Sequence, residues 1–232
     1  MGGHQACSSY PPSQHTMRTL TLQPFYSSTV GRKVLVAATG LFLVVFLLAH
    51  LSGNLLLLSN DGGEAFNAYA HFMSTNPLVR VLEIGLFAGF IGHIVLALQL
   101  NARNRKARGT VGYKKYRGDK TASFFSRSMV WTGSIVLIFL VVHLRSFFVE
   151  HRFGLAPEDV TLYDSVVTAF SSPLYSGFYV LAMIFLAFHL NHGFQSAFQS
   201  LGLQVNRKVG NTLQNIGTGY AVLVCAGFAL LP

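Results

Sequence analysis

Five long stretches of the chain contain almost no charged residue, and each approaches the roughly 20 residues that a helix needs to cross a bilayer. Glu83 is the only charged residue inside them. Within lipid, a helix satisfies its own backbone hydrogen bonds, and stretches this long show no strand-like alternation. The sequence therefore predicts an all-α integral membrane bundle of five transmembrane helices. The five stretches are residues 34–57, 81–101, 128–144, 174–198 and 211–231.

Composition supports a membrane class and excludes several others. Of 232 residues, only 17 are Lys or Arg and 8 are Asp or Glu, whereas about a quarter of a soluble domain is charged. Cys7 and Cys225 are too few for a disulfide framework or a zinc cluster, and the sequence has no CxxCH motif for covalent haem attachment. We expect residues 1–24 to form a polar N-terminal tail and residues 25–232 to form one membrane domain without a soluble catalytic domain.

The basic residues predict how the bundle lies in the membrane. Fourteen of the 17 Lys and Arg residues lie before the first stretch, between the second and third, or before the fifth. The positive-inside rule places these segments in the cytoplasm, which puts the N-terminus inside and the C-terminus outside. These cations flank membrane spans and are not interleaved with stacking aromatics, so we expect no nucleic-acid partner. They could also dock an acidic patch of a soluble partner.

Histidines inside the apolar stretches are the strongest functional signal, because a titratable side chain in a membrane span is costly and usually functional. Counting about 1.5 Å per residue from the nearest inner boundary places His50 and His143 at depths of roughly 25 and 24 Å. The same count places His93 and His189 at about 12 and 9 Å. The four histidines therefore fall at two levels, with two at each level.

Two histidines at each of two levels are what two stacked haems with paired imidazole ligands require. Glycines at helical spacing from the histidines would leave room for the porphyrin, namely Gly53, Gly89 and Gly193. Two alternatives remain: hydrogen-bonded packing histidines, and a zinc site. Zinc would favour one compact cluster over two pairs at different depths.

Three segments resemble the cytochrome b membrane-anchor subunit of succinate dehydrogenase and fumarate reductase, in the class with five helices and two haems. They are NPLVRVLEIGLFAGFIGHIVLALQLNARNRKARGTVGY, SRSMVWTGSIVLIFLVVHL and FHLNHGFQSAFQSLGL. The resemblance covers roughly residues 25–230, and its motifs agree in order and spacing. It implies a multi-pass subunit of the cell inner (cytoplasmic) membrane with two haem b groups. It also implies a flavoprotein subunit and an iron–sulfur subunit as partners on the cytoplasmic side.

The resemblance implies which residues are the axial ligands of the two haem irons, when the ligand roles of that family are carried over to matching positions. His50 and His143 would ligate the outer haem, and His93 and His189 the inner one. This pairing agrees with the two levels obtained from helix geometry.

The fourth apolar stretch holds two histidines, and the family motif distinguishes them. In the family a small residue follows the ligand by four positions, which matches His189 and Gly193. His192 would then be available to a haem propionate, a quinone or the partner subunit. Some members carry an acidic residue two positions before this ligand, linked to proton passage. The corresponding residue here is Ala187, so we do not expect that proton path.

The resemblance also implies an electron-transfer role without catalytic residues for succinate in this chain. Electrons from succinate would pass through the partner subunits and both haems to a membrane quinone, which is menaquinone in the two-haem class. Candidates for an outer quinone site are Glu64, His71 and Asn54. Candidates for contact with a propionate or quinone at the inner mouth are Ser27, Arg32 and Lys33. Polar residues at a membrane edge, such as the first three, are usually just solvated, and simple positive-inside anchoring would equally explain the second three.

Two other functions remain open at this point. A transporter or channel could use the histidines to relay protons or bind an ion, although such proteins often show broken helices or buried acids. The chain could also be the cytochrome b anchor of a different dehydrogenase, such as a hydrogenase or formate dehydrogenase.

Overall fold

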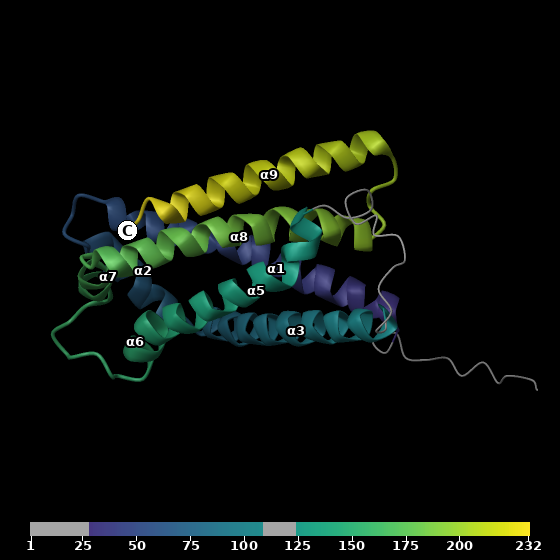
Figure 1. Ribbon diagram of the computed structural model, residues 1–232. Helices are drawn as coiled ribbons and strands as arrows, with labels where there is room; N and C mark the ends of the chain where they lie inside the picture. Colours follow the sequence, from purple (N-terminus) through teal and green to yellow (C-terminus); the bar gives the residue numbers. More distant parts are fainter. Residues whose placement is uncertain (1–27, 109–123) are drawn as a thin grey trace, which may run out of the picture.

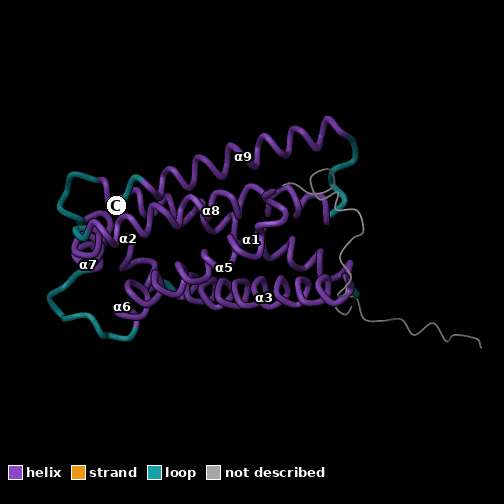
Figure 2. The backbone as a smooth tube through the Cα atoms, viewed as in Figure 1, coloured by secondary structure: helices purple, strands orange, loops and turns teal. Residues whose placement is uncertain are grey.

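The computed structural model describes residues 28–108 and 124–232, and every regular element among them is a helix (Figure 2). Leu55–Leu58 is a 3-10 helix and Leu144–Val149 a π-helix. The elements are α1 (Thr29–Asn54), η2 (Leu55–Leu58), α2 (Glu64–Thr75), α3 (Pro77–Arg108), α5 (Phe124–His143), η3 (Leu144–Val149), α6 (Glu150–Arg152), α7 (Leu162–Phe170), α8 (Pro173–Ser200) and α9 (Arg207–Ala229). The prediction of an all-α chain is confirmed for this part of the molecule. The predicted tail, residues 1–24, lies outside the described residues.

Four helical segments are long and apolar enough to cross a membrane, as predicted: Thr29–Leu58, Pro77–Ala107, Met129–Arg152 and Pro173–Ser200. These helices are longer than the uncharged stretches of the sequence, because each continues into polar residues at its ends. The fifth predicted span corresponds to α9, whose first half is polar and which is not among these four. Its 23 residues run beside α8 along the bundle (Figure 1), a length of about 35 Å. A fifth crossing stays a prediction.

The helices α1, α3, α5 and α8 form a bundle, and α9 packs on its outside against α8 (Figure 1). The most closely packed pairs are α8 with α9, α5 with α8, α1 with α3, and α1 with α8. Close packing therefore follows the order α3, α1, α8, α5, and among the described residues α1–α5, α3–α8 and α3–α5 are not packed closely. In this order α1 lies opposite α5 and α3 lies opposite α8, with histidine rings of each pair near one another across the interior.

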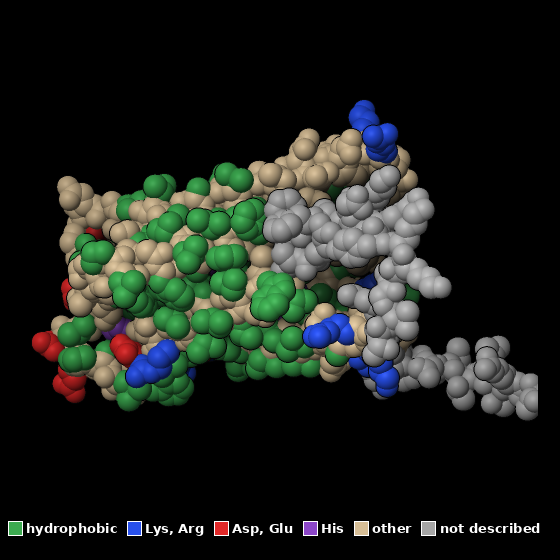
Figure 3. All heavy atoms as spheres, viewed as in Figure 1, with side chains coloured by type: hydrophobic (Ala, Val, Ile, Leu, Met, Phe, Trp, Pro, Cys, Tyr) green, Lys and Arg blue, Asp and Glu red, His purple; other side chains and the backbone are tan. Residues whose placement is uncertain are grey.

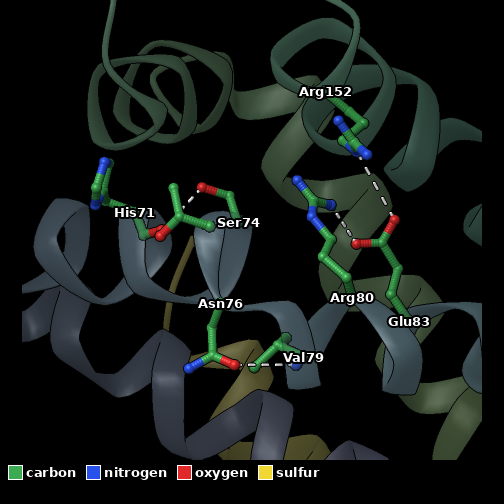
Figure 4. Close-up of polar contacts among 8 residues, drawn as sticks. His71, Ser74, Asn76, Val79, Arg80, Glu83 and Arg152 are labelled. Atoms are coloured by element: carbon green, nitrogen blue, oxygen red, sulfur yellow. Dashed lines mark hydrogen bonds and ion pairs between the residues drawn. The ribbon is translucent and has the colours of Figure 1, made fainter.

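Apolar side chains cover the middle of the bundle (Figure 3). The described acidic residues lie at one end together with Arg80, Arg145 and Arg152, and the other end carries only Lys and Arg among the described charged residues. The basic end holds the start of α1, the end of α3 and the start of α9, with Arg32, Lys33, Arg103, Arg105, Lys106, Arg207 and Lys208. The acidic end holds α2, α6, α7 and the C-terminus (Figure 1). At this end Glu83 pairs with Arg80 and lies 3.8 Å from Arg152 Nε (Figure 4).

The connections at the acidic end, residues 58–78 and 149–172, contain the short helices α2, α6 and α7. Asp61 accepts hydrogen bonds from the Gly63 and Ala65 amides (2.9 and 3.0 Å) and so caps α2. The Asn67 side chain accepts a bond from the Tyr163 amide (3.1 Å), which ties α2 to α7. The two short helices therefore form a fixed cover over this end of the bundle.

The turn into α2 generates a prediction about stability. Gly62 and Gly63 both have positive φ, +67° and +91°, where an L side chain is strained. An added Cβ at Gly62 meets nothing, whereas one at Gly63 overlaps the Tyr163 ring. We expect Gly62→Ala to lower the free energy of unfolding by about 1 kcal/mol and Gly63→Ala by about 3 kcal/mol. Thermal unfolding in detergent measures both, and equal losses would contradict the Tyr163 contact.

Candidate functional site: two facing histidine pairs

The acidic-end pair consists of His50 on α1 and His143 on α5. Their ring centroids lie 5.8 Å apart with an interplanar angle of 80°. Phe139 stacks on His143 at 5.6 Å, and Phe147 from the π-helix lies 5.5 Å away. Because α1 and α5 face each other across the bundle, both imidazoles point into its interior.

The basic-end pair consists of His93 on α3 and His189 on α8. Their ring centroids lie 6.5 Å apart with an interplanar angle of 78°. These two helices also face each other across the bundle. The structure thus brings together the same two pairs that the count along each helix had placed at common depths.

The spacing within each pair fits two ligands on opposite sides of one metal ion. A metal-bound imidazole nitrogen lies about 2 Å from the metal, so the centroids of two opposite rings are about 6 Å apart. The observed 5.8 and 6.5 Å lie on either side of that value. Among the described residues no group of three or more His, Cys, Asp or Glu could hold a metal ion, so the arrangement differs from a zinc cluster.

Hydrogen bonds around His93 fit the tautomer that a metal ligand needs. The Thr39 hydroxyl donates to the Leu35 carbonyl oxygen (2.8 Å) and also lies 3.3 Å from His93 Nδ1. With its own proton on that carbonyl oxygen, Thr39 Oγ1 can accept a bond from Nδ1–H of the tautomer that carries the proton there. Nε2 of a neutral His93 then keeps its lone pair for a ligand.

His189 presents an unsatisfied nitrogen inside the bundle. Its Nδ1 is the only buried side-chain nitrogen or oxygen without a hydrogen-bond partner among the described residues. Leaving such an atom unpaired is costly in an apolar interior. Protein hydrogen bonds therefore do not account for the burial of His189, and this residue is compatible with the predicted ligand role through its other nitrogen, Nε2.

Two glycines from neighbouring helices make room for the basic-end pair. An added Cβ on Gly40 of α1 would lie 3.2 Å from the His93 ring, and one on Gly133 of α5 would lie 3.2 Å from the His189 ring. The sequence had singled out other glycines. Those face different neighbours: Gly53 lies against Tyr69, Gly89 against Phe42 and Gly193 near Met129.

The predicted outer quinone residues are not brought together. Asn54 Nδ2 lies 3.3 Å from both ring nitrogens of His50 and donates to the His50 carbonyl oxygen, so Asn54 belongs to the acidic-end pair. Glu64 and His71 are exposed on α2, seven residues apart (Figure 4 shows His71). Neither side chain contacts Asn54 in the part of the chain that the structure describes.

The predicted residues at the basic end are likewise separate from the histidine pairs. Arg32 donates to Gln99 Oε1 (2.7 Å), which joins α1 to α3, and Lys33 is exposed. Ser27 lies outside the described residues. His192 is half-buried on α8 and belongs to neither ring pair.

Sequence reasoning missed the residues that contact the imidazoles from other helices. These are Gly40, Thr39, Gly133 and Tyr179. A repeated spacing could have found two of them, since Gly40 precedes His50 by ten residues and Gly133 precedes His143 by ten.

The fold and the site together define a class: a multi-pass helical membrane protein with two facing imidazole pairs inside its bundle. The chain is similar to the succinate dehydrogenase cytochrome b558 subunit of Bacillus subtilis (strain 168), with 29% identity over 162 residues. The match covers 69% of this chain and 74% of that protein. It confirms the resemblance to the succinate dehydrogenase cytochrome b subunits. No family model and no solved structure matches the chain.

The glycine contacts generate a prediction for the basic-end pair. Gly133→Ala places a methyl group 3.2 Å from the His189 ring, which must shift by a few tenths of an ångström to accept it. If the basic-end pair binds a haem, we expect this variant to lose most of that haem, measured by pyridine haemochrome analysis of the purified protein. Gly177→Ala is the matched control, because an added Cβ there meets nothing, and it should keep the full content. Full haem content in Gly133→Ala would mean that the glycine is not needed for this site.

Proposed function

We propose that the chain is the membrane anchor and electron-transfer subunit of a succinate:quinone oxidoreductase that carries two b-type haems. The observation that carries this proposal is the geometry of the two imidazole pairs, 5.8 and 6.5 Å apart on helices that face each other. The similarity to a succinate dehydrogenase cytochrome b558 subunit supports the same conclusion.

His50 and His143 would hold one haem, and His93 and His189 the other. Haem iron supplies one-electron transfer when it is bound. The chain's own residues orient one imidazole of each pair, His93 through Thr39 and His143 through Tyr179, and the surrounding apolar side chains exclude water. The dicarboxylate chemistry would belong to the partner subunits.

The basic end of the bundle would face the cytoplasm and receive the iron–sulfur and flavoprotein subunits. Lys and Arg at the ends of α1, α3 and α9 support this orientation under the positive-inside rule. In this arrangement α9 is the fifth crossing, and the C-terminus lies outside the cell inner membrane. The polar first half of α9 packs against α8, where the exposed Thr218 hydroxyl donates to Asn191 (3.0 Å) and so gains a hydrogen-bond partner.

A quinone, menaquinone in the two-haem class, would exchange electrons near the acidic-end pair. Asn54 is the best placed of the predicted residues, because its amide lies against His50. Glu64 and His71 on α2 would then serve proton exchange with the aqueous phase at this end. Arg32, Ser27 and Lys33 would serve a propionate or the partner interface at the other end.

The transporter alternative finds less support. Glu83, the acidic residue inside an apolar stretch, pairs with Arg80 and lies near Arg152 at the end of the bundle (Figure 4). The hydrogen-bond and ion-pair partners of Glu83 are thus arginines rather than histidines. A proton path would require acids close to the imidazoles.

The central test counts haems in the purified chain and in two neighbouring histidine variants. We expect two haems per chain in the native protein, one in His189→Ala and two in His192→Ala. His192 is the matched control because it lies on the same helix, three residues away, outside both ring pairs. Absence of haem from the native protein refutes the proposal, and haem loss in His192→Ala alone refutes the choice of ligand.

The quinone site is tested in the complete complex. We expect Asn54→Leu to raise the KM for a menaquinone analogue about tenfold, equivalent to one lost hydrogen bond. Succinate oxidation with a soluble electron acceptor that bypasses the membrane should not change. Asn67→Leu, at the same end but bonded to α7, is the comparison variant and should keep the native KM. An unchanged KM in Asn54→Leu would place the quinone elsewhere.

A further inference from the structure

A chain of hydrogen-bonding groups connects His143 to two tyrosines of α8. Tyr179 Oη lies 3.3 Å from His143 Nδ1, and Tyr175 Oη lies 3.0 Å from Tyr179 Oη. Tyr175 is half-exposed near the acidic end, whereas Tyr179 is only 7% exposed. These hydrogen bonds thus connect the cover at the acidic end of the bundle to one of the interior imidazoles.

The position of Tyr179 is fixed by aromatic packing rather than by hydrogen bonds alone. Its ring lies 4.9 Å from Phe139 and 5.0 Å from Phe170, both edge-on. Phe139 in turn stacks on His143 itself. A phenol held this way cannot turn its hydroxyl elsewhere without unpacking the cluster, so it keeps its oxygen beside Nδ1.

We propose that Tyr179 is a positioning residue for His143 and sets the redox potential of the haem at the acidic-end pair. This inference rests on the proposed function, because it needs a haem on His143. An iron bound at Nε2 requires the proton of the neutral imidazole to be on Nδ1. His143 then donates to Tyr179, and Tyr179 donates to Tyr175. Ligation therefore fixes one direction for the whole hydrogen-bond chain.

The expected consequence is electronic as well as geometric. A hydrogen bond from Nδ1–H to an acceptor makes the imidazole a stronger donor to iron, which favours the ferric state and lowers the potential. Tyr179 contacts a ligand of one site only: at the other site His93 Nδ1 has Thr39 as its partner, and His189 Nδ1 has none among the described residues. Removing the phenol hydroxyl should thus change one haem and leave the other alone.

The experiment is a redox titration of the two haems in the purified complex with Tyr179→Phe. The ring is kept, so the packing around His143 should survive. We expect both haems to remain, with a higher midpoint potential and an altered low-spin EPR signal for one of them only. That haem is identified as the one that remains in His189→Ala.

A matched control separates this role from general loss of a buried hydroxyl. Tyr220 is a second tyrosine in the bundle, and its hydroxyl donates to the Val44 carbonyl oxygen rather than to a histidine. Tyr220→Phe should leave both potentials and both EPR signals unchanged. If Tyr220→Phe shifts the same haem as strongly as Tyr179→Phe, the positioning role is refuted.

A second variant keeps the inference testable if Tyr179→Phe fails to retain haem. Tyr175→Phe leaves the bond between Tyr179 and His143 in place but removes the acceptor of the Tyr179 hydroxyl. We expect a smaller shift of the same haem in the same direction, and no shift would overturn the inference. If the native protein holds two haems and neither tyrosine variant changes a potential, only the role of Tyr179 is refuted. Native protein without haem refutes the proposed function itself.

Discussion

The high cost of burying an imidazole in an apolar bundle is the constraint on which the rest of this structure depends. Each interior histidine must gain a partner, since an unpaired polar group in such surroundings is destabilising. Two of the four histidines have a partner on another helix: Thr39 of α1 serves His93 of α3, and Tyr179 of α8 serves His143 of α5. His50 has Asn54 of its own helix, and His189 Nδ1 has no partner among the described residues. The polar contacts therefore fix the rotation of neighbouring helices about their axes. This rotation brings the imidazole rings of each pair together.

The depths of the histidines could be predicted from the sequence because depth along a straight helix depends only on residue count. A constant rise per residue and a charged or polar boundary at each helix end were enough to group His50 with His143 and His93 with His189. The same reasoning predicted four of the spanning helices, because uncharged length is read directly from the sequence. The fifth span is less definite, since the first half of α9 is polar.

Lateral contacts could not be predicted in this way, because they depend on how each helix is rotated and which helix lies beside it. The glycines proposed from spacing on the ligand's own helix, Gly53 and Gly89 among them, lie against other side chains. The glycines that touch imidazoles, Gly40 and Gly133, belong to neighbouring helices. The same limit applies to Glu64 and His71, which are on a helix of the cover and thus apart from Asn54 on α1.

The ten-residue spacing shows how four helices can build two sites with one plan. Ten residues span about 15 Å along a helix, so each helix passes both levels. On α1 and α5 the histidine lies at the acidic-end level and the glycine ten residues earlier lies at the other, beside a histidine of the next helix. On α8 the direction is reversed: His189 lies at the basic-end level, and Tyr179, ten residues earlier, contacts His143. Each of these helices therefore supplies a ligand at one level and a contact for a ligand at the other, which couples the geometry of the two sites.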